Sequence, residues 1–468
     1  MSSAIWFRND LRLHDNPAVT AALQQQQGSK AIPALYLASP GQWQAHHWAA
    51  IKIDLLWRHL AQFQRDAAQH QVALEVIIVD DWQQAAKACL SFCQRHQITD
   101  LYFNAEYPVH EQRRDRAVRV WLAEHQVTCH QFDGQLLVAP VIKTQSGGYY
   151  QKFTPFNRAW RAHLAAAGIP AATPLPQQDV TQQLVSIPPC PASRRDSSAW
   201  PVGEAAVQQR LAAYISDQVN NYAAERDRPS CDSTSRLSPY WELGILGPQA
   251  AVRLLQRLSP EFPYGLEQGA DVWLTELAWR EFYQHLMAHI PRLSYGKAFQ
   301  QHTDNFPWNE NTDEFLRWCE GRTGFPIVDA GMRQLAAEGW MHNRVRMIVA
   351  NFLVKDLHID WRWGEQFFMQ QLIDGSFPAN NGGWQWSAST GTDAVPYFRV
   401  FNPTSQSLKV DPDGRYIRTW IKELADCPTA HIHAPGAWLQ AHNRSDYPQP
   451  MVDHSRARER FLAAFKQL

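Results

Sequence analysis

The sequence lacks several features that would assign its class at once. No apolar run is long enough to span a membrane, and the first residues, MSSAIWFRND, do not have the pattern of a signal peptide. The seven cysteines are scattered and odd in number, and no CxxC pair gives the spacing of a zinc site. No GxGxxG follows the first strand-like segment, so the usual dinucleotide fingerprint is missing. We therefore expect a cytoplasmic protein with reduced thiols, without a metal site or a membrane segment.

The sequence also lacks an excess of charge of either sign. The formal net charge is -1, so it argues neither for nor against a nucleic-acid partner. Any contact with DNA must come from a local basic face. Tryptophan, by contrast, is abundant, with 20 residues in a chain of 468. Its ring can pack in a core, stack on a base or carry an electron hole.

Residues 1 to about 130 alternate short apolar runs with amphipathic segments. The apolar runs lie at 4–8, 31–37, 72–79 and 98–104, and helical stretches at Ile51–His70 and Gln83–His96 lie between them. This alternation predicts a parallel sheet built of βαβ units. A ligand of such a sheet is expected at the carboxyl ends of the strands.

The pattern changes twice after this region. Residues 136–204 include a stretch rich in proline, glutamine and serine at 168–204, which predicts an extended connector. Residues 205–468 have a helical period and predict an all-α domain. The expected helices are Glu204–Val219, Gly247–Arg257, Ala270–Ile290, Thr312–Glu320, Val328–Glu338 and Met341–Leu357.

The most unusual segment is Asp374–Asn402, DGSFPANNGGWQWSASTGTDAVPYFRVFN. It is too rich in glycine, asparagine and serine to be one plain helix, and too aromatic to be a surface loop. Small polar groups beside flat rings suit a planar ligand with polar edges, such as a flavin or a nucleobase. The alternative is a core helix with buried tryptophans that the glycines break.

Two further segments favour ordinary structural roles on their residues alone. In the helix at 270–290, Trp273, Glu276, Arg280 and Tyr283 share one face, and Glu276 could simply pair with Arg280 four residues on. Ser and Thr in TSRLS (234–238) could bind a phosphate at a helix N-terminus or could only cap that helix.

Several motifs occur together in one order along the chain. They are the segment at 374–402, WMHNRVRM (Trp340–Met347), GRTGFPIVDAGMRQL (Gly321–Leu335), STSRLSPY (Ser233–Tyr240) and the N-terminal IWFRNDLRLHDNPAV. With these motifs the sequence resembles the photolyase/cryptochrome family, most closely the bacterial members that repair cyclobutane pyrimidine dimers. The resemblance implies an α/β antenna domain at 1–135, a connector at 136–204 and an α-helical FAD-binding domain at 205–468. It also implies light-driven repair, in which excited, anionic reduced FAD passes an electron to a dimer flipped out of the DNA.

The resemblance also implies which residues contact FAD and carry electrons. Asn380 would face the flavin N5, and Arg346 would pair with Asp374, where a fixed cation favours the anionic reduced flavin. Trp384, Trp361 and Trp308 match the electron relay from inside to outside, although three core tryptophans would look the same in sequence. The implied FAD contacts are Tyr222, Thr234, Ser235, Arg236, Leu237, Ser238, Trp273, Arg280, Arg346, Asp374, Gly375, Ser376 and Asn380.

The lesion-binding residues are likewise implied by the resemblance. Trp279 and Trp386 would form two walls around the dimer, and a protonated Glu276 would bond a thymine edge. Met347 suits a site that transfers only an electron, so Glu276, Asn380 and Met347 are the implied catalytic residues. The implied DNA contacts are Arg226, Glu276, Trp279, Arg280, Tyr283, Asn343, Arg344, Trp386 and Gln406, with Arg399 on the same rim.

An antenna chromophore is implied near Trp43, with His110 and Glu111. Glu111 fits the acid that binds a pterin, which indicates 5,10-methenyltetrahydrofolate. His110 stands where an asparagine is expected, and Tyr295 where a lysine is expected. A deazaflavin or an empty antenna site therefore remains as an alternative.

Two other classes of protein compete with a repair enzyme. A cryptochrome photoreceptor would use the same flavin without repair, and a flavin-free module would only bind nucleic acid. The residues at the lesion positions, and the absence of a segment after Leu468, favour repair. We expect a monomer that acts on DNA in the bacterial cytoplasm, beside the nucleoid.

Overall fold

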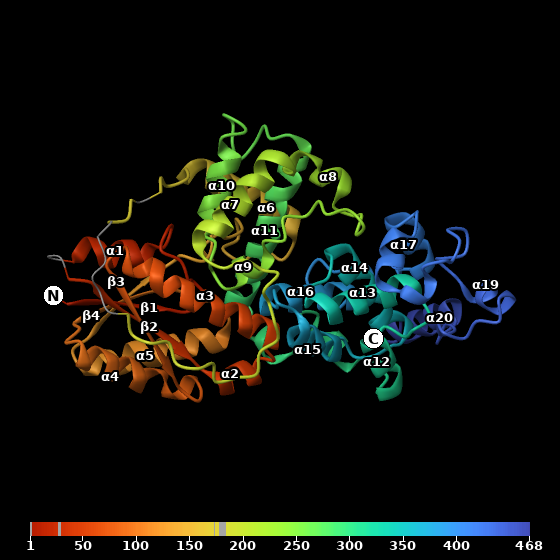
Figure 1. Cartoon of the computed structure of the whole chain (residues 1–468), viewed down its shortest axis with the longest axis horizontal. Helices are drawn as coiled ribbons and strands as arrows, with labels where there is room; N and C mark the ends of the chain where they lie inside the picture. Colours follow the sequence, from red (N-terminus) through yellow and green to blue (C-terminus); the bar gives the residue numbers. More distant parts are fainter. Residues whose placement is uncertain (1, 27–29, 173, 177–183) are drawn as a thin grey trace. The chain divides into compact units, whose positions relative to one another are not determined.

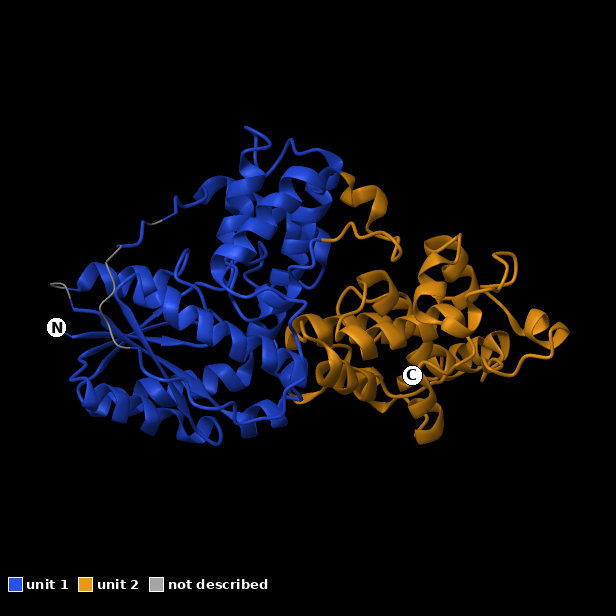
Figure 2. Ribbon diagram, viewed as in Figure 1, with its two compact units in different colours: residues 1–220, 235–294 blue, residues 221–234, 295–468 orange. Residues whose placement is uncertain are grey.

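The computed structural model describes residues 2–26, 30–172, 174–176 and 184–468. The chain forms two compact units, residues 1–220 with 235–294 and residues 221–234 with 295–468 (Figure 2). Among the described residues, no helix is both long enough and apolar enough to cross a membrane. All seven cysteines are free thiols.

The first unit contains the expected parallel sheet (Figure 1). The strands β1 (Ser3–Phe7), β2 (Ile32–Ala38), β3 (Val72–Ile78), β4 (Asp100–Asn104) and β5 (Thr128–Phe132) lie in the order β3-β2-β1-β4-β5. All four strand pairs are parallel. β5 was not expected, because its sequence, TCHQF, has no apolar run. It lies at the edge of the sheet, where its side chains are half-buried or exposed.

Helices cover both faces of this sheet (Figure 1). α1 (Pro17–Gln25) and α3 (Ala50–Ala68) lie on one face, and α4 (Ala85–Arg95) and α5 (Val109–Glu124) on the other. Between the second pair and the strands is a core that includes Trp6, Phe103, Cys89, Phe92 and Leu122. The prediction of βαβ units is therefore confirmed.

The first unit also holds a group of helices from later in the chain. They are α6 (Phe153–Ala167), α7 (Glu204–Asp217), α9 (Ser238–Glu242), α10 (Pro248–Gln256) and α11 (Gln268–His289). α6 lies inside residues 136–204, which we expected to be a connector, but before the stretch at 168–204 that we expected to be extended. It forms because Phe153, Phe156, Trp160 and Leu164 make a buried stripe at helical spacing. Residues 173 and 177–183 of the expected connector lie outside the described residues.

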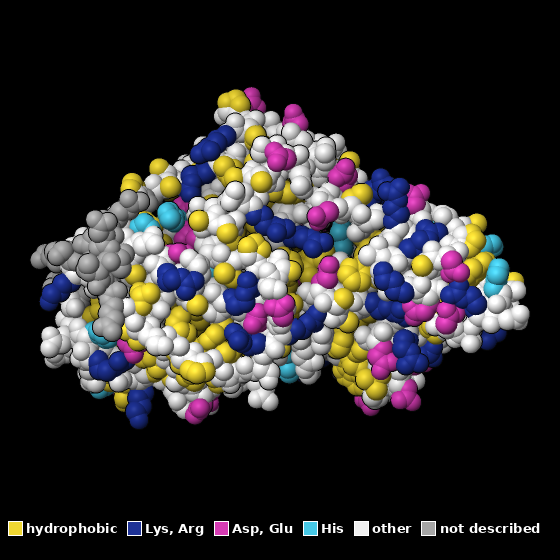
Figure 3. Space-filling model, viewed as in Figure 1, with side chains coloured by type: hydrophobic (Ala, Val, Ile, Leu, Met, Phe, Trp, Pro, Cys, Tyr) yellow, Lys and Arg dark blue, Asp and Glu magenta, His cyan; other side chains and the backbone are white. Residues whose placement is uncertain are grey.

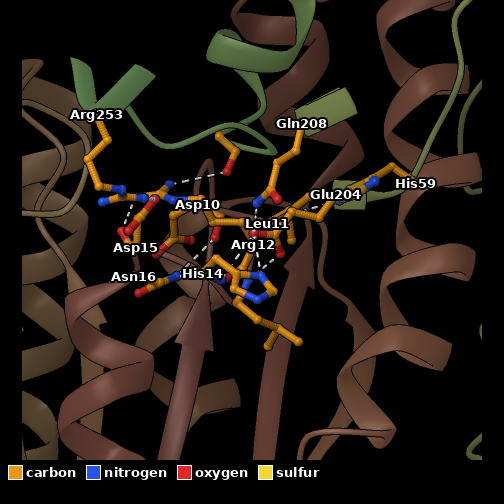
Figure 4. Close-up of polar contacts among 12 residues, drawn as sticks. Asp10, Leu11, Arg12, His14, Asp15, Asn16, His59, Glu204, Gln208 and Arg253 are labelled. Carbon is orange, nitrogen blue, oxygen red and sulfur yellow. Dashed lines mark hydrogen bonds and ion pairs between the residues drawn. The ribbon is translucent and has the colours of Figure 1, made fainter. Parts of the chain in front are cut away.

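A polar network joins the loop after β1 to α7 (Figure 4). The Glu204 carboxylate accepts hydrogen bonds from the backbone N–H of Leu13 at 2.9 Å and of His14 at 3.1 Å. The Asn16 amide donates to the carbonyl oxygens of Asp10 and Arg12 in the same loop. The protein's own side chains therefore hold the loop that follows β1 in place.

The second unit is helical, as its sequence period indicated (Figure 1). It contains α8 (Tyr222–Glu225), α12 (Thr312–Cys319), α13 (Pro326–Glu338), α14 (Asn343–Asn351), the π-helical turn η5 (Phe352–Asp356), α15 (Trp361–Gln371), α16 (Phe377–Ala388), α17 (Pro403–Val410), α18 (Arg415–Trp420), α19 (Gly436–Ala441) and α20 (His454–Phe465). α16 runs unbroken through Gly382 and Gly383, so the expected break does not occur. The helix ends instead at Ser389, whose φ of 61° is left-handed.

Candidate functional site

The predicted FAD contacts fall on both units. Ser235–Ser238, Trp273 and Arg280 belong to the first unit, whereas Tyr222, Thr234, Arg346, Asp374–Ser376 and Asn380 belong to the second.

The second unit contains the predicted ion pair between Arg346 and Asp374. One Arg346 Nη lies 2.8 and 3.1 Å from the two carboxylate oxygens, and its Nε donates to the Met341 carbonyl at 2.7 Å. The Asp374 side chain is buried and Arg346 is partly exposed. Gly375 closes the next turn by donating to the Leu372 carbonyl, and Ser376 is the N-cap residue of α16. A fixed guanidinium therefore lies just before this helix.

The amide of Asn380 on α16 is held in one orientation. Its nitrogen donates to the Glu365 carbonyl oxygen at 2.9 Å, because the opposite orientation would place two oxygens against each other. The Asn380 side-chain oxygen has no hydrogen-bond donor among the residues that the structure describes. Asn380 therefore offers an acceptor, which suits a protonated ring nitrogen.

The sequence analysis missed a buried network of hydrogen-bonded side chains next to Asn380. Asn381 donates to the Glu365 carboxylate at 2.8 Å, and Gln385 donates to the Asn381 oxygen at 2.9 Å. Burial raises the pKa of Glu365 to about 7. The available signal was the pair of amides at 381 and 385, four residues apart, which place a polar stripe on an otherwise apolar helix face. These bonds fix α16 against α15.

The three tryptophans of the predicted relay all lie in the second unit. Trp384 and Trp361 are buried, and Trp308 is half-buried. The Trp384 ring contacts Phe368 at 5.0 Å and Trp318 at 6.1 Å between centroids. Trp308 contacts Phe306 at 4.3 Å. The side chains are thus buried at Trp384 and Trp361 and partly exposed at Trp308, as a relay that carries an electron hole to the surface requires.

Two arginines predicted to contact DNA share one carboxylate. Arg344 Nε and Nη2 lie 2.9 and 2.6 Å from Asp227 Oδ1, and Arg226 Nε lies 4.0 Å from the same oxygen. Arg344 also contacts the Met347 sulfur at 3.7 Å. Asn343, on the same helix, is exposed. Sequence reasoning missed Asp227, because one acid in YAAERDRPS looks like ordinary surface charge.

We expect Asp227→Asn to strengthen binding to DNA of any sequence. Loss of this carboxylate frees Arg344 and Arg226 for phosphates and removes a repulsive charge. The expected gain in affinity at low salt is about three- to tenfold, close to the upper value for an exposed ion pair. Fluorescence anisotropy with a labelled duplex, repeated over a range of salt concentrations, measures it.

Asp413→Asn is the matched control for this prediction. It makes the same change of charge at an exposed carboxylate on the same unit, 3.8 Å from Arg415. An equal gain in DNA affinity in both variants would show that the effect comes only from the change in net charge. Weaker binding by Asp227→Asn would mean that Asp227 orients Arg344 for DNA, which contradicts the prediction.

The remaining DNA contacts predicted on the second unit are spread over other elements. Trp386, on α16, is half-buried with its ring 6.4 Å from that of Phe401. Gln406 lies on α17 and is half-buried, and Arg399 is exposed in the preceding loop. Lysine and arginine side chains alternate with acidic ones on the face that Figure 3 shows, which agrees with the net charge of -1.

α11 in the first unit carries the other predicted lesion residues. Trp279, Glu276 and Tyr283 are half-buried, and Trp273 is buried with its ring 5.7 Å from Tyr214. Arg280 donates to the Gln135 carbonyl at 3.1 Å, and burial lowers the pKa of its guanidinium. The helical spacing predicted this shared face, and the structure contains it.

The TSRLS segment does not form the expected N-cap. α9 begins at Ser238, and its N-cap residue, Leu237, makes no side-chain cap hydrogen bond. Arg236 has a left-handed φ of 48°, and the Ser235 carbonyl accepts from Arg210 at 3.0 Å. The segment is thus held through its backbone. Its hydroxyls do not cap the helix that follows.

The predicted antenna residues lie after β2 and β4 in the first unit. Trp43, on α2 (Pro40–Ala45), stacks on Trp48, and His46 contacts the rings of Trp82 at 5.1 Å and His110 at 5.8 Å. Burial, with a smaller contribution from His110, lowers the pKa of His46 to about 4. Tyr295 belongs to the other unit and is exposed.

Glu111 is the unusual group of this cluster. Its Oε2 is buried and has no hydrogen-bond partner among the described residues. Burial, together with the nearby Glu106, raises the pKa of Glu111 to about 8. The carboxyl group is therefore mostly protonated at neutral pH and can donate a hydrogen bond to a ligand. A buried, unsatisfied group of this kind calls for a partner outside the chain.

The comparisons with known proteins cover the whole chain. Residues 3–178 match the family model "DNA photolyase", and residues 273–467 match "FAD binding domain of DNA photolyase". The Deoxyribodipyrimidine photo-lyase of Vibrio cholerae is 43% identical over 99% of this chain and 98% of its own length. The crystal structure of a class III photolyase from Agrobacterium tumefaciens superposes with a TM-score of 0.85 at 34% identity, covering 100% of this chain and 97% of that one. A Synechocystis cryptochrome has a TM-score of 0.85 at 27% identity, covering 99% of both chains.

Proposed function

The chain belongs to the DNA photolyase family and carries that family's FAD-binding domain, and from this premise we propose that it repairs cyclobutane pyrimidine dimers in DNA when illuminated. The observation that supports this most is the identity of 43% over nearly the full length with a relative named Deoxyribodipyrimidine photo-lyase. The half-buried indole of Trp279 and the half-buried Glu276, three residues apart on α11, add to it. They give an aromatic and a hydrogen-bonding group for a base outside the duplex.

The residues of the second unit fit a flavin. The buried Asp374 holds the Arg346 guanidinium in place, and that cation stabilises an anionic ring system. Asn380 offers its oxygen as an acceptor from a ring N–H. When bound, reduced and excited FAD supplies the one electron that opens the cyclobutane ring, and the same electron is returned afterwards.

The protein's own groups perform binding and positioning in this reaction. Arg344 and Arg226 bind phosphates, which fixes the register on DNA without reading its sequence. Trp279 stacks on the flipped-out bases and replaces the stacking lost from the duplex. Glu276, on the same helix as Trp279, provides a hydrogen-bonding group for a thymine edge.

The test uses DNA that carries a single thymine dimer. The purified, reduced protein is incubated with it under blue or near-ultraviolet light, and recovery of thymine absorbance is followed against a dark control. Recovery in light alone, lost in Trp279→Ala or Glu276→Ala, is the expected result. Tight flavin binding without recovery in light would refute the repair function.

A cryptochrome-type photoreceptor is the second candidate, because the Synechocystis cryptochrome shares this fold over 99% of the chain. Fold alone does not separate the two functions, since both use a flavin and a chain of tryptophans. The same illumination experiment does. A photoreceptor would reduce its flavin in light and leave the dimer unchanged.

We also propose that the Trp43–Glu111 cluster binds a reduced folate as an antenna. The neutral His46 and the protonated Glu111 add no charge of their own, and the ring of Trp82 lies 5.1 Å from that of His46. A pterin ring is flat and carries hydrogen-bonding edges, and the methenyl bridge of 5,10-methenyltetrahydrofolate adds a delocalised positive charge. A deazaflavin shares the flat ring and is the alternative occupant.

We expect Glu111→Gln to keep the affinity for folate at pH 7 and Glu111→Ala to weaken it. The pKa near 8 makes Glu111 a donor below pH 8, and a glutamine N–H replaces that donor, whereas alanine leaves the ligand about tenfold weaker. Above pH 8 the wild-type carboxyl ionises and its affinity should fall, while that of Glu111→Gln should not. Absorbance titration with methenyltetrahydrofolate from pH 6.5 to 9.5 measures both (about 1.5 pH units on either side of that pKa).

Glu124→Gln, at the exposed end of the same helix, is the control and should bind as wild type does. Parallel pH profiles for wild type and Glu111→Gln would contradict the prediction. No binding of folate by the wild type would favour the deazaflavin.

A further inference from the structure

A phenylalanine lies flat against the tryptophan that we assign to lesion stacking. The rings of Phe153, the first residue of α6, and Trp279 on α11 have centroids 3.6 Å apart and planes inclined by only 6°. Aromatic pairs in proteins usually adopt offset or edge-to-face arrangements with centroids at about 4.5–7 Å. A stack this close and this parallel must be held by the residues around it.

Phe282 supports both rings from the side. Its ring meets Phe153 edge-on at 5.8 Å and Trp279 edge-on at 5.7 Å. Phe156, one turn further along α6, packs on Phe282 at 5.2 Å. The stacked pair is thus closed along one edge, and Phe153 covers one face of the indole.

Hydrogen bonds fix the register of the two helices. Arg161 of α6 bonds Asp271 at 2.6 Å and Thr275 at 3.0 Å, before Trp279 on α11. Trp160 donates to the buried Glu281 at 2.7 Å, after it. Because these bonds lie on both sides of Trp279, α6 cannot slide along α11 without breaking one set. Phe153 therefore stays opposite the indole.

Trp279 keeps an accessible part in this arrangement, since its side chain is half-buried although Phe153 covers one face. An indole that is held in one plane loses less conformational entropy when a base stacks on it. We propose that Phe153 is a positioning residue, which holds the plane of Trp279 so that the opposite face receives the flipped-out dimer. This inference rests on the proposed repair function and assigns selectivity for damaged DNA to a residue that does not touch it.

The experiment compares binding to two duplexes of the same sequence, one with a thymine dimer and one without. Dissociation constants are measured in the dark for wild type, Phe153→Leu and Phe153→Tyr. Phe153→Leu should weaken binding of the dimer duplex by about tenfold, from the loss of ordered stacking. Its binding of the undamaged duplex should stay within about twofold, because phosphate contacts determine that affinity. Phe153→Tyr keeps the ring and should restore the preference.

Phe156→Leu is the matched control. It removes a ring of the same size from the same helix, and Phe156 is more buried than Phe153, at 1% against 7% exposed. Its ring lies against Phe282 and His285, not against Trp279. If Phe153 only stabilised the fold, Phe156→Leu would lower the preference for damaged DNA at least as much as Phe153→Leu. We expect it to lower the melting temperature and to keep the preference for damaged DNA.

The outcomes separate the two proposals. A wild type without preference for the dimer duplex would refute the repair function itself. A wild type with that preference, together with a Phe153→Leu variant that retains it, would overturn the role of Phe153 alone. Equal loss of preference in Phe156→Leu, or loss of binding to both duplexes in Phe153→Leu, would overturn it as well.

Discussion

Replacement of Trp384 by phenylalanine is expected to slow light-driven reduction of the bound, oxidised flavin by at least about tenfold, which is about 1.4 kcal/mol on the barrier. Trp384 is 2% exposed and is the first tryptophan of the predicted relay. Phenylalanine fills most of the same space but is much harder to oxidise, so the hole cannot pass outward. Absorbance of the flavin during illumination with an external reductant measures the rate.

Repair by chemically reduced Trp384→Phe should continue, because the dimer receives its electron without the relay. Trp318→Phe is the matched control. Trp318 is equally buried and contacts the Trp384 ring at 6.1 Å, and its Nε1 donates to the Val349 carbonyl at 3.1 Å. It should retain photoreduction. An equal loss in both variants would place Trp318 on the relay, and normal photoreduction in Trp384→Phe would refute the relay through Trp384.

The second large effect is expected at Gly364 of α15. A Cβ added there would lie 2.1, 2.4 and 2.6 Å from three carbons of the Trp384 ring. Neither partner can move freely, because α16 is fixed to α15 through Glu365, Asn380 and Asn381. Gly364→Ala should therefore cost about 3 kcal/mol of stability, as expected for overpacking in a close-packed core. Thermal unfolding followed by near-ultraviolet circular dichroism measures the loss.

Gly383→Ala is the control for this prediction. Gly383 lies on α16 and is exposed, and a Cβ there would meet nothing within 4 Å. Alanine is the better helix former, so Gly383→Ala should gain roughly 0.5–1 kcal/mol. If Gly364→Ala melted at the wild-type temperature, the tight contact between α15 and Trp384 would be refuted.

Sequence periodicity was sufficient for most elements of the fold. Four apolar runs became β1 to β4, and the helical period located α7 and α10–α14 with small shifts of their ends. β5 was not found, because an exposed edge strand needs no apolar run. α6 was hidden by the proline-rich stretch that follows it. The run of α16 through two glycines depends on tertiary contacts that outweigh propensity.

The features of the candidate site were likewise predicted from the sequence only in part. The pairing of Arg346 with Asp374 followed from the family resemblance and is confirmed. Asp227 and Phe153 were not predictable, since each acts through a residue distant in sequence, Arg344 and Trp279. The roles of the predicted contacts with FAD, antenna and lesion stay predictions. Their residue types are visible in the sequence, but the sequence alone does not give the contacts that a ligand would make with them.

The network after β1 has a consequence for the construction of chimeras. Glu204 of α7 bonds Leu13 and His14, Arg253 pairs with Asp15, and Lys52 Nζ lies 2.7 Å from Glu242. The α/β segment therefore cannot be exchanged on its own. In a chimera with a crossover near residue 200, the two residues of each pair would come from different parent proteins. A recombinant that takes residues 1–294 from one parent keeps all of them together. In this chain the α/β segment should be exchanged with α6, α7, α9, α10 and α11 attached.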